Sequence, residues 1–157
     1  MNEINKLELI FQELGEHWGF ENFRYNNEQP NILIFNEILT VHLKQSENQK
    51  NLVIFVNLGP AYTDNATSEQ KLQRLHKILE ANLLWKDTSN GTLSLKSSGE
   101  VIYCYQTPIN SLTSGGLEAF LDAFVNQATQ LQQDLLTAPL CNDDSNLFNN
   151  DASMLRI

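Results

Sequence analysis

The sequence predicts a single α+β domain in which helices pack against one side of an antiparallel sheet, in the order α-β-β-β-α-β-β-α. Three observations predict it. Apolar residues recur at three- and four-residue spacing in separate segments, which is the period of an amphipathic helix. Runs rich in Ile, Val, Leu and Phe lie between these segments, and turn residues bound several of the runs. With 157 residues, of which 41% are hydrophobic, the chain can bury a core without disulfides or metals.

The N-terminal part is predicted to hold a helix and then a group of strands. Residues 3–18 form the helix and Gly19 ends it, because one stripe is apolar and comprises Ile4, Leu7, Phe11, Leu14 and Trp18. Residues 31–35, 38–44 and 52–58 have the composition of strands. The last of these runs, Leu-Val-Ile-Phe-Val, is apolar on both faces. It predicts either a central strand or a strand whose outer face is covered by a partner.

The second helix is predicted from residue 68 to about residue 84. Thr67 and Gln70 fit a capping box at its start. Its apolar stripe consists of Leu72, Leu75, Leu79 and Leu83, is widened by Ile78 and Leu84, and is followed at once by Trp85. Two interpretations of the stripe stay open: it faces the domain's own sheet, or it is a surface for another chain.

A hairpin and a last helix complete the predicted domain. Asn90-Gly91 is a turn signal, and residues 92–96 and 101–106 are strands joined by a short Gly-containing loop. Ser114 is the expected N-cap of a helix that ends near residue 136. Its apolar positions are Leu117, Phe120, Leu121, Phe124, Val125, Ala128, Leu131 and Leu135. Residues 1–137 are therefore predicted as the folded domain, and the acidic segment 138–157 as a mostly disordered tail.

Charge and hydropathy exclude several classes of function. The net charge is −9 and the pI is near 4.6, whereas a nucleic-acid-binding protein normally carries a basic patch. No apolar run approaches the roughly 20 residues of a membrane-spanning helix, and residues 1–8 do not look like a secretory signal. We therefore expect a cytoplasmic protein with neither a nucleic-acid partner nor a membrane span.

The sequence also shows little reactive chemistry. His17, His42 and His76 fall on three different predicted elements, and none has a Cys or His at metal-ligand spacing. Cys104 lies inside a predicted strand and Cys141 in the tail, so a structural disulfide is not predicted. No Gly-rich phosphate-binding loop is present. We expect no catalytic residues, no metal and no cofactor. A small hydrolase would require loop carboxylates to come together on folding, which a sequence cannot show.

One part of the chain resembles a known family. Residues 79–85 read Leu-Glu-Ala-Asn-Leu-Leu-Trp, and a Gly turn, a Leu-x-Leu strand, a Gly-Glu turn, a strand that ends in Pro108 and a helix with Phe120, Phe124 and Ala128 follow. This succession resembles the class I type III secretion chaperones of the Tir-chaperone (CesT-like) family. The resemblance covers about residues 3–136. Before residue 79 it is one of pattern only, because an amphipathic helix followed by apolar strands is common in α+β domains.

The resemblance implies a homodimer. In the family the second helix pairs with its symmetry mate and the fourth and fifth strands contribute. A two-fold interface of this kind requires a self-complementary patch, which the wide apolar stripe could supply. Carried over by position, the dimer candidates are Leu72, Leu75, His76, Leu79, Leu83, Trp85, Tyr103 and Tyr105.

The resemblance also implies a function: binding the N-terminal segment of a secreted effector, keeping it non-globular, soluble and secretion-competent, and helping to deliver it to the secretion apparatus. The implied partners are that effector, a second copy of the chain and the secretion-system ATPase. Apolar residues of the first helix and the sheet are the effector-binding candidates, each with a place in the core as its alternative: Phe11, Trp18, Phe20, Ile32, Ile34, Val41, Phe55 and Leu58. Without the resemblance, a generic peptide-binding or scaffold module stays open, and so does the hydrolase.

Overall fold

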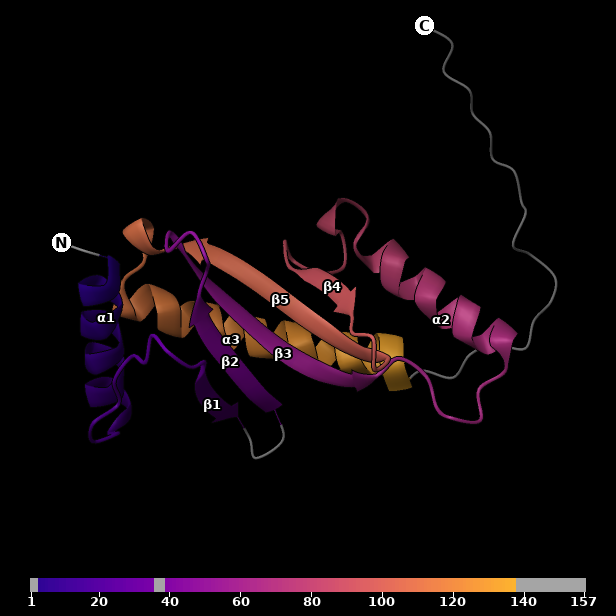
Figure 1. Ribbon diagram of the computed structural model, residues 1–157, viewed down its shortest axis with the longest axis horizontal. Coiled ribbons are helices and arrows are strands. Elements are labelled where there is room, and N and C mark those ends of the chain that lie inside the picture. The colour runs from indigo at the N-terminus through magenta and orange to yellow at the C-terminus, as the bar shows by residue number, and fades with distance from the viewer. Residues whose placement is uncertain (1–2, 36–38, 138–157) are drawn as a thin grey trace, which may run out of the picture.

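The computed structural model describes residues 3–35 and 39–137 and has the predicted element order (Figure 1). The helices are α1 (Glu3–Trp18), α2 (Ser68–Ala81) and α3 (Ser114–Leu131), and the strands are β1 (Asn31–Phe35), β2 (Leu39–Gln45), β3 (Asn51–Pro60), β4 (Thr92–Leu95) and β5 (Glu100–Pro108). Short 3-10 helices cover Leu83–Trp85 and Ile109–Ser111, and a π-helical turn covers Gln132–Thr137. The predicted α+β class is confirmed. The tail predicted over residues 138–157, together with Cys141, lies outside the described residues, and so does Glu37.

The sheet is antiparallel throughout, in the order β1-β2-β3-β5-β4. The strand that is apolar on both faces, β3, therefore pairs on both sides and is the central strand of five, as one of its two interpretations predicted. Burial alternates along it: Leu52, Ile54 and Val56 are fully buried, whereas Val53 and Phe55 are half-buried. The period of two assigns the first set to the inner face of the sheet and the second to the outer face.

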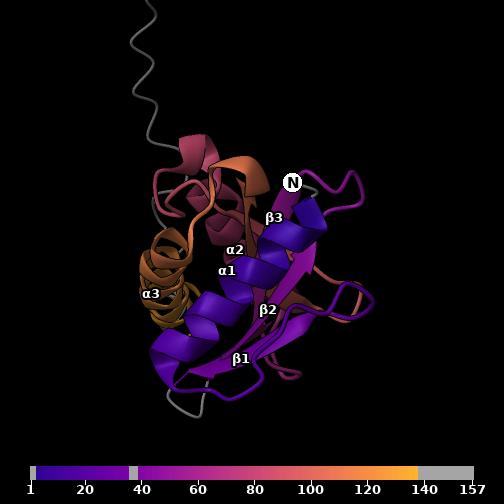
Figure 2. The ribbon, with the colours of Figure 1, turned by 90° about the vertical axis from the view of Figure 1, so that its left-hand side faces the viewer.

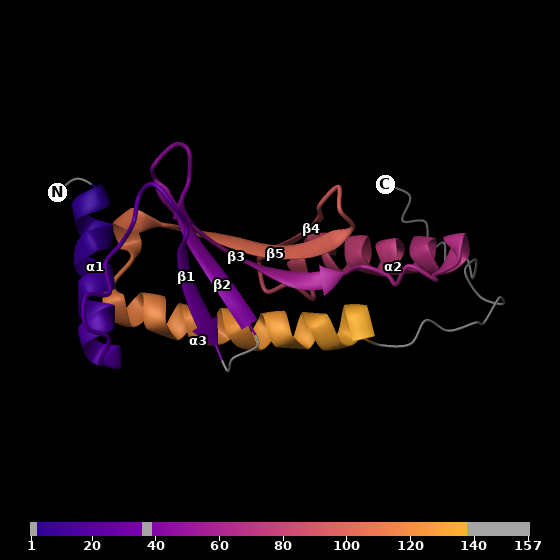
Figure 3. The same cartoon turned by 60° about the horizontal axis from the view of Figure 1, so that its bottom comes forward.

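Helices α1 and α3 both cover the inner face of the sheet (Figures 2 and 3). Helix α3 runs lengthwise along the sheet and α1 lies across one end of it. The core between these layers is apolar, and its largest fully buried side chains include Leu7, Phe11, Leu14, Leu43, Ile54, Tyr103, Leu117 and Leu121. Burial of this area is the main stabilising contribution to the domain.

Helix α2 projects at the end of the sheet far from α1, beside β4 (Figures 1 and 3). Its predicted capping box is confirmed: the Gln70 backbone N–H donates to Thr67 Oγ1 at 3.2 Å, and the Thr67 N–H donates to Gln70 Oε1 at 3.0 Å. The helix ends at Ala81, before the predicted residue 84, because Leu84 and Trp85 adopt left-handed backbone conformations with φ of 55° and 54°. These two residues reverse the chain toward β4.

One predicted cap was placed one residue too late. Helix α3 begins at Ser114, and its N-cap is Thr113, whose Oγ1 accepts a hydrogen bond from the Gly116 N–H at 3.1 Å. Threonine and serine both cap helices well, and they are adjacent here, so the sequence could not distinguish them.

A tight contact holds the segment between α2 and β4 against the core. The Tyr103 hydroxyl donates to the Thr88 carbonyl at 2.8 Å, and its ring stacks on Phe124 with the centroids 4.8 Å apart. Gly91 lies directly against this ring: a Cβ added there would be 2.3 Å from Tyr103 Cε2. Only glycine fits at this position without moving a buried side chain that is fixed on two sides.

We therefore expect Gly91→Ala to lower the free energy of unfolding by about 1–3 kcal/mol, the usual cost of overpacking a filled core. Gly115→Ala is the matched control, because a Cβ added at Gly115 meets nothing within 4 Å and alanine favours the helix. Urea unfolding followed by circular dichroism measures both variants. An unchanged midpoint for Gly91→Ala would contradict the close approach to Tyr103.

Candidate protein-binding surfaces

The apolar stripe of α2 points away from the body of the domain. Leu72 and Leu79 are each 69% exposed and Leu83 is 65% exposed, whereas Arg74, Ile78 and Ala81 are the buried residues of the helix. The interpretation that this stripe faces the domain's own sheet is therefore wrong for these three leucines. Ile78 was expected to widen the stripe, but it lies on the opposite, buried side. An exposed row of leucines on a projecting helix is typical of a surface for another chain.

The other dimer candidates divide between surface and core. His76 and Trp85 are exposed, and Leu75 and Tyr105 are half-buried. Tyr103 is only 1% exposed, so its assignment to an interface is corrected: it is a core residue, held by Thr88 and Phe124. The exposed residues Leu72, His76, Leu79, Leu83 and Trp85, with the half-buried Leu75 beside them, form what we call the α2 surface. Tyr105 is not part of it, because its ring packs on Phe120 of α3 with the centroids 4.6 Å apart.

A second surface lies where α1 ends. Trp18, Phe20 and Phe23 form an aromatic cluster with ring centroids 6.1 to 6.3 Å apart. The Trp18 indole Nε1 donates to Glu118 Oε1 on α3 at 2.9 Å, which fixes this end of the helix. Phe20 is 55% exposed, although it is a large apolar residue. An exposed aromatic residue on a fixed support is suited to contact with a partner.

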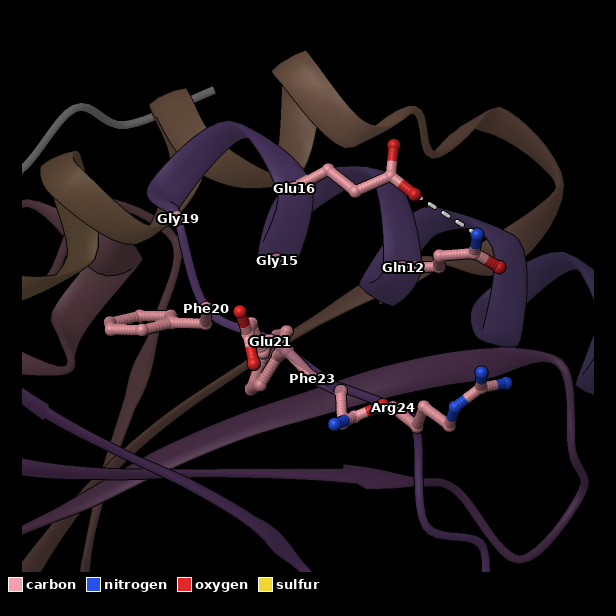
Figure 4. A pocket seen from close by; sticks show the side chains of 9 residues that line it. Gln12, Gly15, Glu16, Gly19, Phe20, Glu21, Phe23 and Arg24 are labelled. Carbon is pink, nitrogen blue, oxygen red and sulfur yellow. Dashed lines mark hydrogen bonds between the residues drawn. The ribbon is translucent and has the colours of Figure 1, made fainter.

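A pocket of about 490 Å³ opens beside this cluster (Figure 4). It is lined by Gln12, Gly15, Glu16, Gly19, Phe20, Glu21, Asn22, Phe23 and Arg24. Its apolar wall comes from Phe20 and Phe23, and its charged groups are two carboxylates, from Glu16 and Glu21, against the single cation Arg24. This arrangement suits an apolar side chain next to a basic residue. We call it the α1 pocket.

Sequence reasoning missed Phe23. It lies between the first helix and the first strand, outside every predicted element, yet it stacks on the core ring of Phe11 with centroids 5.3 Å apart. The chain approaches so closely here that a Cβ on Gly15 would be 2.6 Å from Phe23 Cβ. Two phenylalanines within four residues after a helix end, Phe20 and Phe23, were the available signal.

The third surface comprises the outer face of the sheet and the edge of β1, which pairs only with β2 within the described residues. Ile32 and Ile34 of β1 are 55% and 68% exposed. The register places Ile32, His42, Phe55 and Cys104 side by side across four strands, and His42 stacks on Phe55 with centroids 5.0 Å apart. Helices α1 and α3 both lie on the other face (Figure 2). We call Ile32, Ile34 and Phe55 the β1 surface.

Three effector-binding candidates belong to the core instead. Phe11 and Val41 are 0% exposed and Leu58 is 1% exposed. Val41 and Leu58 lie on the inner face of the sheet, and Phe11 lies on the buried side of α1. They therefore cannot contact a partner at the surface of this chain. Of the remaining candidates, Phe20, Ile32 and Ile34 are exposed, and Trp18 and Phe55 are half-buried.

Reactive groups are dispersed. Within residues 3–35 and 39–137 the structure brings together no group of three or more His, Cys, Asp or Glu that could hold a metal ion. His17 lies 3.4 Å from Glu118 Oε1, and His76 lies 4.0 Å from Glu80 on the same helix, both as exposed side chains. None of the helices in the described part of the chain has the length and apolar character needed to cross a bilayer.

The model of the Tir chaperone protein (CesT) family matches residues 10–132 of the chain. Comparison with curated protein sequences finds no match. Among solved structures, a chain of the ExsC–ExsE complex superposes with a TM-score of 0.72 at 18% identity and covers 88% of this chain and 100% of its own. The Yersinia pestis type III secretion chaperone SycH, solved with a fragment of YscM2, gives a TM-score of 0.59 at 23% identity and covers 80% of this chain and 98% of its own.

A chain of the HopA1–SchA chaperone-effector complex gives a TM-score of 0.61 at 12% identity, and covers 85% of this chain and 94% of its own. At these identities the superpositions establish the fold. The family rests on the sequence match, which spans most of the described residues.

Cys104 offers a test of how open the outer face is. Burial raises the pKa of its thiol, which lowers the fraction present as the reactive thiolate at a given pH. In a Cys141→Ser variant, Cys104 is the single cysteine of the chain. We expect it to react with a chromogenic disulfide more slowly than it does in the unfolded protein, at a rate that still rises with pH above the ordinary pKa of a thiol. A rapid reaction, whose rate reaches half its maximum at a pH below the pKa of an ordinary thiol, would contradict the half-buried placement.

Proposed function

Because the chain belongs to the Tir chaperone protein (CesT) family, we propose that it is a type III secretion chaperone that binds the N-terminal segment of a secreted effector. It keeps that segment non-globular, soluble and competent for secretion, and it helps to deliver it to the secretion apparatus. The observation that carries this proposal is the presence, on one small acidic domain of this family, of an edge strand that pairs on one side only within the described residues and exposes its outward isoleucines.

The β1 surface suits an extended ligand. An edge strand offers a row of backbone donors and acceptors to any chain in β conformation, so affinity does not depend on a particular sequence. Ile32 and Ile34 then provide apolar contacts at the spacing of alternate residues in the added strand. A segment held in this way cannot complete its own fold, which is the state that a secretion chaperone maintains.

The α1 pocket adds selectivity to this surface. Phe20 and Phe23 accept an apolar side chain, and Glu16 and Glu21 favour a neighbouring basic residue. The net charge of −9 acts in the same direction over the whole surface and keeps the loaded chaperone soluble. The captured segment is accordingly one in which apolar residues alternate with polar ones and basic residues are close by.

The α2 surface serves a different purpose, homodimerisation. Its leucines lie at the end of the sheet opposite to α1, so pairing through them leaves the α1 pocket and β1 accessible (Figure 3). A two-fold axis near Leu79 would place each leucine row against the other, which is the self-complementary arrangement that such an interface requires. Two copies binding one segment is the corresponding stoichiometry.

No catalytic step is part of this proposal, and the site of action is the cytoplasm. The generic peptide-binding module and the small hydrolase both lack a supporting observation, and the family match favours the chaperone over each. A purified protein that turned over a small substrate, at a rate abolished by changing His42, would overturn this assignment.

Leu79→Asp tests the dimer. An unpaired charge in a buried interface costs several kcal/mol, so we expect monomers or aggregates where the wild type is a dimer at micromolar concentration. Gln73→Asp adds the same charge to the same helix away from the stripe, and it should leave the dimer intact. Multi-angle light scattering after size exclusion measures both. A monomeric wild type would remove the dimer proposal.

Ile34→Asp tests capture. The probe is the N-terminal segment of a type III effector from the same genome, chosen by the proximity of its gene, and its binding is measured by calorimetry. We expect binding at least tenfold weaker than in the wild type, since Ile34 loses its apolar contact and gains a desolvated charge. Phe55→Asp should act in the same direction.

Leu95→Asp is the matched control for capture. It places the same charge on an exposed residue of the opposite edge strand, and it should bind the segment like the wild type, with dimerisation unchanged in both variants. Equal loss of binding in Ile34→Asp and Leu95→Asp would rule out β1 as the capture edge. Absence of any complex on co-expression with the neighbouring secreted protein would rule out the chaperone.

A further inference from the structure

Asn82 forms an unusual pair of hydrogen bonds with the edge strand β4. Its side-chain Nδ2 donates to the Leu93 carbonyl at 2.9 Å, and the Leu93 N–H donates to Asn82 Oδ1 at 2.8 Å. In an antiparallel ladder, a residue of the neighbouring strand makes the same two bonds, one as donor and one as acceptor. The carboxamide of Asn82 therefore occupies the place of a sixth strand at this edge.

The position of Leu93 makes this pair important. The Lys96 N–H donates to the Glu100 carbonyl at 2.9 Å, so Lys96 faces β5, and by alternation Ser94 and Thr92 face it too. Leu93 and Leu95 are then the residues of the four-residue strand β4 that direct their backbone groups outward. Asn82 engages both groups of one of these two residues. A further strand could not pair with β4 without displacing it.

The backbone around Asn82 is anchored independently of its side chain. The Asn82 N–H donates to the Leu79 carbonyl at 3.2 Å, and the Trp85 N–H donates to the Asn82 carbonyl at 3.1 Å. Farther along, Gln127 Nε2 of α3 donates to the Asp87 carbonyl at 2.8 Å, and the Tyr103 hydroxyl holds Thr88. A change of the Asn82 side chain should thus leave the segment, and the fold, in place.

The two edges of the sheet therefore differ. Within the described residues, β1 at one edge pairs with β2 alone and exposes Ile32 and Ile34. At the other edge β4 lies beside α2 and is closed by Asn82. We propose that Asn82 is a positioning residue that closes the β4 edge and so directs strand addition by a captured segment to β1. The part of this inference that concerns the captured segment rests on the proposed function. The closure of the β4 edge does not depend on it. An open edge would also let copies of the chain join strand to strand, which protein surfaces usually prevent.

Asn82→Ala opens the edge, and Asn126→Ala removes an exposed amide elsewhere as the matched control. In the free protein we expect Asn82→Ala to keep its circular dichroism spectrum and to form assemblies larger than the wild type. Its Leu93 amide should exchange about tenfold faster, because this N–H loses its hydrogen bond to Asn82 Oδ1. Adding Leu95→Lys to Asn82→Ala should disperse these assemblies, because a lysine on an edge strand blocks pairing. A merely structural role for Asn82 would not be rescued in this way.

The second arm locates a captured segment by hydrogen exchange, with the same N-terminal effector segment as probe. Wild-type protein should gain protection in β1 and none in β4, and Asn82→Ala should gain protection in both. Protection of β4 in the wild type would overturn the closure. So would an Asn82→Ala variant whose Leu93 amide exchanges at the wild-type rate and whose assemblies have the wild-type size. If no segment binds, the chaperone proposal fails, and the free-protein measurements still decide the role of Asn82.

Discussion

The packing of α3 along the inner face of β3 and β5 is the interaction on which the rest of the structure depends. Phe124 of α3 stacks on Tyr103 of β5, and that tyrosine in turn holds the segment that leads from α2 to β4. With α3 and α1 used to cover the inner face, no described helix is left to cover the outer one, and α2 is left at the end of the sheet. The exposed apolar surfaces follow from how few helices the domain has, which is why they persist in a folded chain.

Exposing leucines and isoleucines in water opposes solubility, and the composition of the chain compensates for it. Isolated apolar residues on a surface are ordinary, but rows of them attract one another in any two copies that meet. A net charge of −9 on 157 residues makes such encounters repulsive at long range, while a row of matching shape still overcomes the repulsion at contact. Strong negative charge and selective association are therefore compatible in one small protein.

The sequence predicted the elements and their order better than it predicted what each face contacts. Alternation along β3 and the capping box at Thr67 and Gln70 are local patterns, and both were confirmed. The orientation of α2 is not local: its buried side combines Arg74 with Ile78 and Ala81, whereas Leu72 and Leu79 are exposed, and the apolar periodicity alone does not predict this division. Tyr103 was assigned to an interface, and Phe11, Val41 and Leu58 were left between groove and core, for the same reason. An apolar residue on an amphipathic element is compatible with a core and with an interface until the neighbouring layers are known.

The placement of α2 at one end of the molecule and of α1 with β1 toward the other has a geometric consequence (Figure 3). If two chains meet through α2, their capture edges lie at the two extremes of the assembly, and a single ligand that serves both must bridge the distance between them. An extended chain covers such a distance with the fewest residues, because an extended residue advances about 3.3 Å whereas a helical one advances about 1.5 Å. The assembly would thus select ligands by length, favouring long extended segments over compact or short ones.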